Sequence, residues 1–430
     1  MWVASGPVFC RGVGLASALV TNAVNDDAST LGDLHARYLV TKAAVHAAKA
    51  LTSPGWRPEQ RLETLMECHG SVLAARGPGN PLPFGEFRQA LSRDLAELLP
   101  DGVEPVELRG LSVVDQDGQV TEDAFDLDFE QRMLLHTLRK LDRGVSVLGV
   151  RELREEVEQE TVYLALSKQG LQATYENGRE DLIRYPSGHT AELADLRLPP
   201  SVVDFYQDIP YGSTHQGWWY ACPICRWPMR LVLRKSAGVL AGSARCWHTP
   251  HAEMGASYLF RPTSDGSAAE LLPEPRPERP AGREAVLFPD LDAIPEPMPA
   301  DKHKALVRGI WRYTTIPGIP ELALRDQLHK RGLDVDLWPS LDAYDLLVTI
   351  PGNGKCFKVD VKDYTSATTL ASLIHAQEGD RGGAEWLVVP DYRAGQVPLL
   401  SEVCRKYGMK ASTASAFAES ACNQAGVRWA

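Results

Sequence analysis

Two aspartates and a lysine near the C-terminal end of the sequence lie on segments that are expected to pair as β-strands. Residues 344–350 and 355–362 are rich in apolar residues, and the Asn-Gly pair between them is typical of a hairpin turn. If the strands pair, the carboxylates of Asp345 and Asp360 converge near the end of the sheet, and Lys362 lies on the same face as Asp360. Two carboxylates in this arrangement can bind a divalent cation through oxygen. Such an ion polarises a phosphodiester and lowers the pKa of a bound water.

Lys362 and Glu321 complete the predicted catalytic site. Lys362 can orient the attacking water or neutralise the negative charge that develops on the phosphate. Glu321 lies on a predicted helix with Pro320 at its first position and Gly332 past its end, and it could support a second ion or position the water. The predicted catalytic residues are Asp345, Asp360, Lys362 and Glu321, with Asp345 and Asp360 as ligands of Mg²⁺ or Mn²⁺.

The pattern Asp-x(14)-Asp-x-Lys, preceded by a glutamate on a helix, resembles the PD-(D/E)XK nuclease superfamily. The dipeptide Tyr344-Asp345 stands where that superfamily often has Pro-Asp. The resemblance covers about residues 305–415 and implies a restriction-endonuclease-like α/β fold, a mixed central sheet flanked by helices. It also implies a Mg²⁺-dependent endonuclease that hydrolyses DNA, with an inactive member of the same fold as the alternative. The other elements expected in this domain are a strand over 334–338, a helix over 366–378, a strand over 386–389 and a helix over 398–407.

Part of this region resembles a narrower family, the nuclease that accompanies Argonaute-like PIWI proteins in bacterial defence clusters. The segments that carry this resemblance are 311–313, 317–318, 321–322 and 341–346. The resemblance implies a partner protein, either Argonaute-like or a helicase, and a role in bacterial defence against foreign DNA.

A second group of candidate ligands contains three cysteines and two histidines. Cys222 and Cys225 form a Cys-x-x-Cys pair, and Cys246 follows about twenty residues later, as in zinc ribbons. Three thiolates and one imidazole make a closed structural site for Zn²⁺. We expect His248 as the fourth ligand because it is close to Cys246 in sequence, with His251 as the alternative. Buried free thiols are the interpretation without metal, and a redox role is disfavoured because no thioredoxin-like βαβ pattern surrounds the pair.

The cysteine segment is also basic and aromatic. Residues 209–252 contain no Asp or Glu. Aromatic side chains interleaved with arginine suit stacking on bases and contact with phosphates, although the tryptophans could instead pack the small zinc module. The predicted nucleic-acid-binding residues are Arg226, Arg230, Arg234, Lys235 and Arg245, and the aromatic residues are Trp218, Trp219, Tyr220, Trp227 and Trp247.

Composition and periodicity divide the chain into four segments. Residues 1–205 are predicted to be mainly helical, residues 206–262 to form a zinc-ribbon-like module, and residues 301–430 to form the nuclease domain. Residues 263–300 are rich in proline and predict an extended linker, with a surface loop docked through residues 286–288 as the alternative.

Two predicted helices of the first segment suggest a different function. They cover residues 122–142 and 151–168 and are joined through Gly144, so they could form a helix-turn-helix. In that case the protein would be a transcription regulator that binds a specific duplex sequence without cutting it.

Overall composition limits the classes of function. The chain has 430 residues, and its 44% hydrophobic content is inconsistent with a largely disordered protein. No apolar run reaches the ~20 residues that cross a bilayer, and residues 1–20 make a poor secretory signal. Eight cysteines are too few for a disulfide scaffold, so we expect a reduced, cytoplasmic protein.

The net charge of −11 argues against a protein that coats nucleic acid, but the charge is unevenly distributed. Residues 301–430 hold 16 basic and 15 acidic residues, a charge of +1, which leaves −12 for the first 300 residues. The average therefore hides a neutral predicted nuclease and a basic cysteine segment. The remaining alternative is a non-catalytic assembly protein that binds nucleic acid or a partner through a vestigial nuclease fold.

Overall fold

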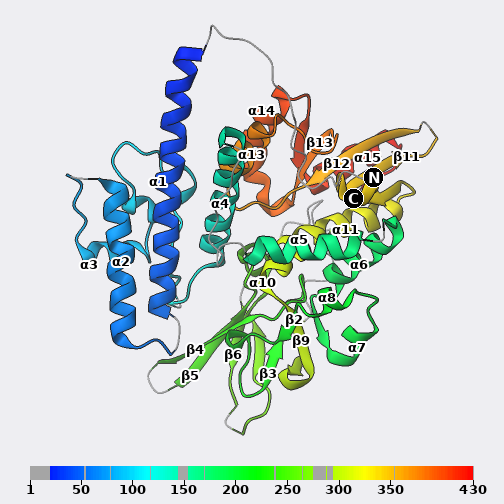
Figure 1. The fold of residues 1–430 in the computed structure, drawn as a ribbon. Helices are drawn as coiled ribbons and strands as arrows, with labels where there is room; N and C mark the ends of the chain where they lie inside the picture. The colour runs from blue at the N-terminus through cyan, green and yellow to red at the C-terminus, as the bar shows by residue number, and fades with distance from the viewer. Residues whose placement is uncertain are drawn as a thin grey trace. The chain divides into compact units, whose positions relative to one another are not determined.

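The fold of the chain is taken from a computed structural model (Figure 1). It describes residues 20–52, 55–77, 79–116, 118–143, 154–168, 170–236, 239–263, 265–274, 287, 294–352 and 354–429. Contacts divide the chain into two compact units. Unit 1 comprises Met1–Ser146 and Tyr364–Ala376, and unit 2 comprises Val147–Asp363 and Gln377–Ala430. No helix in the described part of the chain is long and apolar enough to cross a membrane.

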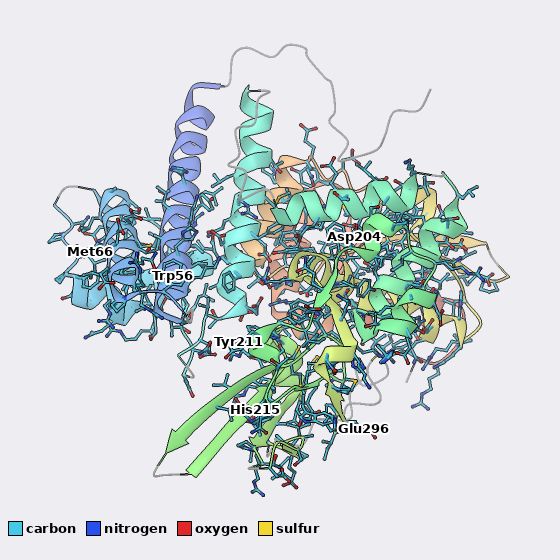
Figure 2. The ribbon with its side chains drawn as sticks, turned by 60° about the horizontal axis from the view of Figure 1, so that its bottom comes forward. Trp56, Met66, Asp204, Tyr211, His215 and Glu296 are labelled. Atoms are coloured by element: carbon cyan, nitrogen blue, oxygen red, sulfur yellow. The ribbon has the colours of Figure 1, made fainter. Side chains whose placement is uncertain are left out.

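Unit 1 is built from helices. Small apolar residues of α1 (Val20–Thr52), among them Ala44, Ala47 and Ala48, are fully buried and allow α2 (Pro58–Arg76) to pack closely against it. Met66 on α2 and Trp56 just before it remain exposed (Figure 2). The other helices of the unit are α3 (Phe84–Ala90), the short 3-10 helices η1 (Leu95–Leu98) and η2 (Val106–Leu108), α4 (Glu122–Arg143) and α13 (Ala367–Ala376).

Helix α13 belongs to unit 1 although it follows the predicted catalytic strand in sequence. The buried carboxylate of Glu130 on α4 accepts hydrogen bonds from the backbone N–H groups of Thr365 (2.6 Å) and Ser366 (3.0 Å), which satisfies donors at the start of α13. Leu373 of α13 also packs in a small apolar cluster with Leu134 of α4. The helix predicted over 366–378 is present, but its packing against α4 was not predicted.

The central sheet of unit 2 is mixed and has the order β10-β11-β12-β13-β14. Strands β10, β11 and β12 are antiparallel, whereas β12, β13 and β14 are parallel. The hairpin predicted between β11 and β12 is confirmed, with Leu346 opposite Val359. Its turn includes Gly352 and Gly354 with φ of +90° and +66°, a conformation that favours glycine. The strand bounds are β10 (Asp334–Leu337), β11 (Leu346–Ile350), β12 (Lys355–Val361), β13 (Trp386–Val389) and β14 (Lys410–Thr413).

Helices α11 (Ile316–His329), α14 (Val397–Lys406) and α15 (Ala414–Gln424) pack against this sheet. Phe417 of α15 meets Phe357 of β12 and Trp386 of β13 edge to face, with ring centroids 6.2 and 5.3 Å apart. A mixed sheet covered by helices agrees with the predicted α/β class.

Pro320 is not the first residue of a helix, so that prediction is wrong. Helix α11 begins at Ile316, directly after α10 (Arg308–Ile310) and the π-helical segment η6 (Trp311–Thr315), and Pro317 lies in its first turn. Pro320 is therefore inside the helix, where it cannot donate the backbone hydrogen bond that an interior helical residue makes. Gly332, with φ of +80°, follows the end of α11 as expected.

In unit 2, two strands of the cysteine segment pair with two strands that follow it. The resulting four-stranded antiparallel sheet consists of β4 (Arg230–Ser236), β5 (Val239–Arg245), β6 (Ser257–Arg261) and β7 (Glu270–Pro273). Two smaller sheets join distant parts of the unit. Strand β3 (Trp218–Tyr220) pairs with β8 (Pro297–Pro299), and β9 (His303–Leu306) pairs with both β1 (Ser187–His189) and β2 (Tyr206–Asp208). One apolar core consequently runs from Val162 to Trp429.

The predicted proline-rich linker is partly structured. Strands β7 and β8 lie within residues 263–300, both at sheet edges, where proline is tolerated. Leu287 is buried in the core of unit 2, which favours the docked-loop alternative, while its neighbours 275–286 and 288–293 lie outside the described residues. The four segments predicted from composition remain a prediction. The two compact units are defined by contacts between residues, and their bounds do not correspond to those segments.

The predicted helix-turn-helix has its two helices in different compact units. Helix α4 belongs to unit 1, and α5 (Arg154–Ser167) belongs to unit 2. The junction through Gly144 lies outside the described residues. DNA reading by this pair remains a prediction.

Candidate active site and metal centre

Asp345, Asp360 and Lys362 lie together at one end of the β11–β12 hairpin. The backbone N–H of Asp345 donates to the carbonyl of Val359 (3.0 Å), which continues the ladder and places Asp345 beside Asp360. Both carboxylates are buried. The ammonium Nζ of Lys362 lies 3.2 Å from Oδ2 of Asp345 and 2.6 Å from Oδ1 of Asp360. The hairpin therefore brings these three residues, which are separated in sequence, into one compact cluster.

Glu321 reaches the same cluster from α11, but through other partners than Lys362. Its buried carboxylate accepts a hydrogen bond from the indole Nε1 of Trp338 (2.5 Å). It also forms an ion pair with the guanidinium of Arg179, whose Nη2 lies 3.3 Å from Oε2. The same Nη2 lies 3.6 Å from Oδ1 of Asp345, so Arg179 joins Glu321 to Asp345.

Arg179, Trp338, Asp342 and Arg381 are members of the site that the sequence did not reveal. Arg179 lies on α6 (Gln172–Arg184), in the segment read as a helical region without a chemical motif. It pairs with Asp342, and Nε of Arg381 lies 3.7 Å from Oδ2 of Asp360. No local pattern marks Arg179, because its partner Glu321 is 142 residues away in sequence.

A left-handed turn, α12 (Pro339–Asp342), sets the position of Trp338 and Asp342. Trp338, Ser340 and Leu341 have φ of 47°, 57° and 57°, a region that non-glycine residues rarely adopt. Gln172 of α6 holds this turn, since its Oε1 accepts from the Leu341 N–H (3.0 Å) and its Nε2 donates to the Trp338 carbonyl (2.9 Å). Helix α6 thus supports the site both through Arg179 and through this turn.

Burial and neighbouring charges shift the pKa values of the three carboxyl groups in different directions. Burial raises the pKa of Glu321 well above its usual range, with Asp345 acting in the same direction and Arg179 against it. Burial also raises the pKa of Asp360, against the effect of Lys362. Burial acts upward on Asp345 too, but Lys362 and Arg179 outweigh it, and the pKa of Asp345 lies below its ordinary value. Burial alone would lower the pKa of Lys362, yet the two aspartates raise it, so Lys362 stays cationic.

The donor set suits a hard divalent cation such as Mg²⁺ or Mn²⁺. Oδ2 of Asp360 is buried and accepts no hydrogen bond from the described part of the chain. A buried acceptor of this kind beside a second carboxylate fits oxygen ligation. Asp345 and Asp360 would hold the ion, whereas the oxygens of Glu321 already contact Arg179 and Trp338.

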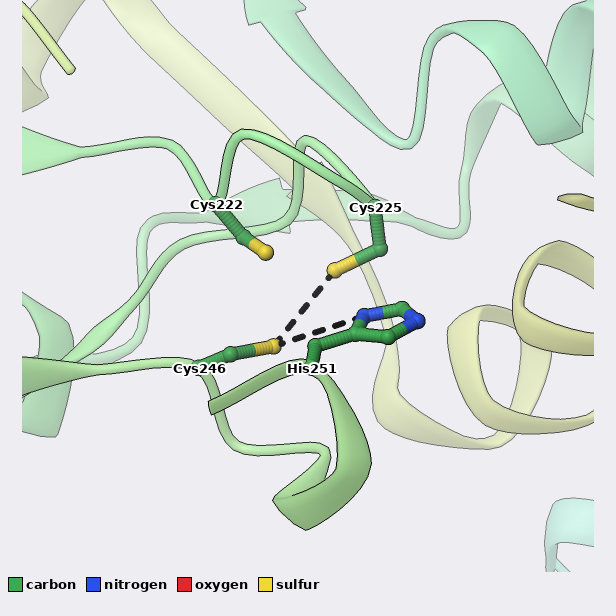
Figure 3. A group of neighbouring side chains, drawn as sticks. All are labelled: Cys222, Cys225, Cys246 and His251. Atoms are coloured by element: carbon green, nitrogen blue, oxygen red, sulfur yellow. Dashed lines mark hydrogen bonds between the residues drawn. The ribbon is translucent and has the colours of Figure 1, made fainter. Parts of the chain in front are cut away.

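The cysteine segment contains a second possible metal centre (Figure 3). One ligand atom from each of Cys222, Cys225, Cys246 and His251 lies within 4.8 Å of all the others, and all four residues are buried. Sγ of Cys246 lies 3.7 Å from Sγ of Cys225 and 3.8 Å from Nδ1 of His251. Three sulfur atoms and one imidazole nitrogen in this arrangement could hold Zn²⁺.

The histidine that lies with the three thiols is His251, the alternative named from sequence, and not His248, which was the preferred ligand. Helix α9 (Thr249–Met254) begins directly after His248, and its first turn carries His251 to the thiols. His248 faces elsewhere, with its Nε2 3.5 Å from Oδ2 of Asp363. Closeness in sequence to Cys246 was misleading because a helical turn separates the two histidines.

Asp363 lies between the end of β12 and the Cys/His cluster. It directly follows Lys362, and its buried carboxylate lies 2.9 Å from Nε of Arg393 and 3.5 Å from Nη1 of Arg312. His248, the third partner of Asp363, packs edge to face on His251 with ring centroids 4.6 Å apart. Burial raises the pKa of Asp363, but Arg393, Arg312 and His248 outweigh this effect and hold it well below the usual range.

The structure describes three of the five predicted nucleic-acid-binding side chains. Arg226 is exposed, the guanidinium of Arg230 lies 5.5 Å from the ring centroid of Trp247, and Nη2 of Arg245 forms an ion pair with Glu274 (3.1 Å). The side chains of Arg234 and Lys235 lie outside the described residues.

The aromatic residues of the segment mainly pack. Trp219, Tyr220 and Trp227 are buried, and Trp227 stacks on Trp311 with ring centroids 4.2 Å apart. Tyr211, which sequence reasoning did not select, is 85% exposed (Figure 2). Among the aromatic side chains named here, Tyr211 is the most exposed.

Comparison with known families gives one result. A family model described as "REase associating with pPIWI_RE", where REase is a restriction endonuclease, matches residues 318–429. This segment contains Glu321, Asp345, Asp360 and Lys362, and the match supports a restriction-endonuclease-like nuclease domain. Arg179 and the Cys/His cluster lie outside it. Comparison with curated proteins and with solved structures gave no match.

Proposed function

We propose that the protein is a metal-dependent nuclease that hydrolyses phosphodiester bonds in DNA, acting as an endonuclease. The observation that carries the proposal is the buried Asp345–Lys362–Asp360 cluster within the segment that matches a restriction-endonuclease family. Oδ2 of Asp360 is buried, accepts no hydrogen bond from the described residues, and has Nε of Arg381 at 3.7 Å as its charged neighbour. This acceptor supports an ion-binding role for the cluster.

Each residue of the cluster has a distinct proposed role. Asp345 and Asp360 hold Mg²⁺ or Mn²⁺, which when bound polarises the phosphodiester and lowers the pKa of a water. Lys362 bridges the two carboxylates when no ion is bound, and its partly exposed side chain can turn toward the phosphate and neutralise the developing charge. Glu321 supports the cluster from α11 through its contacts with Arg179 and Trp338.

The proposed biological role is bacterial defence against foreign DNA in the cytoplasm. The description of the matching family names association with a PIWI-related protein, and this association is proposed for the present chain. A structural Zn²⁺ bound by Cys222, Cys225, Cys246 and His251 is proposed to stabilise unit 2. Arg226 and Tyr211 are the described exposed residues through which the cysteine segment would contact nucleic acid.

Cleavage of supercoiled plasmid DNA in Mg²⁺ or Mn²⁺ tests the proposal. We expect Asp360→Asn and Lys362→Ala to lower the rate by at least about 100-fold, because each removes a group that acts on the reacting phosphate. Asp336→Asn on β10 and Lys355→Ala at the other end of β12 are matched controls on exposed positions and should cut like the wild type. The assay is run with and without the PIWI-related partner. Equal cleavage by all five proteins, or none by the wild type in either condition, would favour the non-catalytic assembly protein.

A further inference from the structure

The carboxylate cluster contains a buried arginine from outside the family-matched segment. Arg179 lies on α6, and only 11% of its side chain is exposed. Its Nη2 lies 3.4 and 3.3 Å from the two oxygens of Glu321 and 3.6 Å from Oδ1 of Asp345. Its Nη1 pairs with Asp342 and donates to the hydroxyl of Tyr175 (3.2 Å). The guanidinium is therefore fixed by partners on several elements.

Arg179 and Lys362 contact different oxygen atoms of the carboxylates. Lys362 contacts Oδ2 of Asp345 and Oδ1 of Asp360, whereas Arg179 contacts Oδ1 of Asp345 and both oxygens of Glu321. Oδ2 of Asp360 is buried and accepts no hydrogen bond from the described residues. On the Asp345–Asp360 side the cations are Lys362 and Arg381, and Nε of Arg381 lies 3.7 Å from Oδ2 of Asp360 without a hydrogen bond. On the Glu321 side, Arg179 donates hydrogen bonds to both carboxylate oxygens, so that side is the more fully occupied.

The two cations also differ in mobility. Lys362 has a flexible stem, and 26% of its side chain is exposed, so it can leave when an ion binds. Arg179 is more buried, and its guanidinium lies 4.6 Å from the ring centroid of Trp338, which adds a cation–π contact. Displacing Arg179 would leave an unpaired buried charge, which is strongly unfavourable.

The charge of the cluster supports the same conclusion. Four carboxylates (Glu321, Asp342, Asp345 and Asp360) face three cations (Arg179, Lys362 and Arg381). Once Lys362 turns away, as its flexible stem allows, the four carboxylates face only Arg179 and Arg381, and one divalent ion balances the remaining two negative charges. A second would place an uncompensated positive charge in a buried site, whereas two-metal sites need carboxylates free to face both ions.

We infer that Arg179 is a positioning residue that occupies the Glu321 side of the cluster and restricts it to one divalent ion, held by Asp345 and Asp360. The inference rests on the proposed function and deepens it. It states how many divalent ions bind, and it assigns the positive charge on the Glu321 side of the cluster to Arg179. The support role of Glu321 is then to hold Arg179 in place, without a second ion.

Counting bound Mn²⁺ tests this inference without measuring cleavage. Mn²⁺ is titrated into the full-length protein, loaded beforehand with Zn²⁺ so that the Cys/His cluster is filled, and followed by electron paramagnetic resonance. We expect the wild type to bind one Mn²⁺ that is lost in Asp360→Asn. Arg179→Met removes the charge, and we expect the number to rise to two. Arg184→Met, on the same helix and paired with Glu180, is the matched control and should still bind one.

The possible results separate the inference from the proposed function. Two Mn²⁺ on the wild type, or one on Arg179→Met with unchanged affinity, would overturn the inference and leave the nuclease proposal intact. Absence of any Mn²⁺ that depends on Asp360 would overturn the proposed function itself. If circular dichroism shows that Arg179→Met does not fold, Arg179→Gln keeps an amide for the carboxylates and decides by the same count.

Discussion

Lys362 holds together two buried carboxylates that would otherwise repel each other. Its Nζ lies within 3.2 Å of Asp345 and 2.6 Å of Asp360, and both aspartates are almost fully buried. Breaking a buried ion pair by removing one partner is strongly destabilising, because it leaves uncompensated charge. The lysine therefore has a structural task when no ion is bound, in addition to its proposed role at the phosphate.

This dual role predicts that Lys362→Ala is unstable only in the absence of a divalent ion. We expect its free energy of unfolding to fall by about 2 kcal/mol in EDTA, with the loss limited by the partial exposure of the lysine. Mn²⁺ should recover most of this loss, since it supplies the missing positive charge. Urea denaturation with and without Mn²⁺ measures the effect, and Lys355→Ala is the control. A loss of the same size in both conditions would contradict the proposed place of the ion.

Glu180 forms the other strong ion pair of α6. Its carboxylate is held by Arg325 of α11 in two hydrogen bonds of 2.9 and 3.0 Å and by Arg184 at 2.6 Å. The hydrogen bonds from Arg325, followed by those from Arg184, lower the pKa of Glu180 to about 2 although partial burial acts upward. Because the folded pKa is below the ordinary value, the stabilisation is present at neutral pH and is lost as pH falls from about 4.5 towards about 2.

We therefore expect Glu180→Gln to lower the free energy of unfolding by about 1 kcal/mol at pH 7, a value reduced for the partial exposure of the pair. The difference from the wild type should be smaller at pH 4, where the carboxylate of the unfolded chain is already protonated. Urea denaturation at the two pH values measures it, with exposed Glu385→Gln as the control. A difference that is larger at pH 4 than at pH 7 would contradict a lowered pKa of Glu180 in the folded protein.

At the scale of elements, the site depends on loops that bring backbone segments unusually close. The loop before β13 approaches the turn that precedes Asp345, and the contact is between Gly382 and Ala343. Gly382 has φ of +63°, and a Cβ there would overlap the carbonyl oxygen of Ala343. The neighbouring Gly383 has φ of +83°, but the nearest atom to a Cβ is Nζ of Lys358 at 3.8 Å.

These two glycines give a matched pair of variants. Both Gly382→Ala and Gly383→Ala place a side chain at positive φ, which is unfavourable by about 1–2 kcal/mol. Gly382→Ala must also move the backbone of Ala343, so we expect it to be less stable than Gly383→Ala by a further 2 kcal/mol or so. Its Mn²⁺ affinity should fall as well, because Asp345 follows closely after Ala343. Equal stability of the two variants would contradict the close approach.

The hairpin and the α/β elements were predictable because their signals are local. Alternating residues and an Asn-Gly turn define β11 and β12, and these place Asp345, Asp360 and Lys362 together. The start of α11 was missed because a π-helical segment precedes it and Pro320 lies inside the helix. His251 was ranked second because sequence distance does not show which way a helical turn points. Arg179 could not be found at all, since its ion pair with Glu321 joins residues 142 positions apart.

At the scale of the whole molecule, the cysteine segment and the nuclease sheet share one core within unit 2. Cys222, Cys225 and Cys246 belong to the same apolar cluster as Val359 of β12. The stack of Trp227 on Trp311 and the hydrogen bond from Trp227 Nε1 to the carbonyl of Leu306 (2.9 Å) join the two parts. The Cys/His cluster is thus part of the packed core of unit 2.

Loss of the metal centre should therefore destabilise the nuclease as well. We expect Cys246→Ser to lower the melting temperature of unit 2 by roughly 10 °C, because a structural zinc site contributes several kcal/mol to folding. Plasmid cleavage and Asp360-dependent Mn²⁺ binding should be lost at the same lower temperature. Exposed Cys356→Ser is the control and should retain one zinc per chain. A variant without zinc that keeps the wild-type melting temperature would contradict this coupling.

The path of the chain through α13 limits how this protein can evolve. After Asp363 the chain enters unit 1, forms α13 and returns to unit 2 at Gln377, so unit 1 is made of two separate stretches of sequence. A recombination event that transferred residues 301–430 alone would carry α13 without Glu130, which binds its first N–H groups, and would also leave Arg179 behind. The helical and nuclease segments should consequently be inherited together, and a gene that split between them would encode two incomplete products.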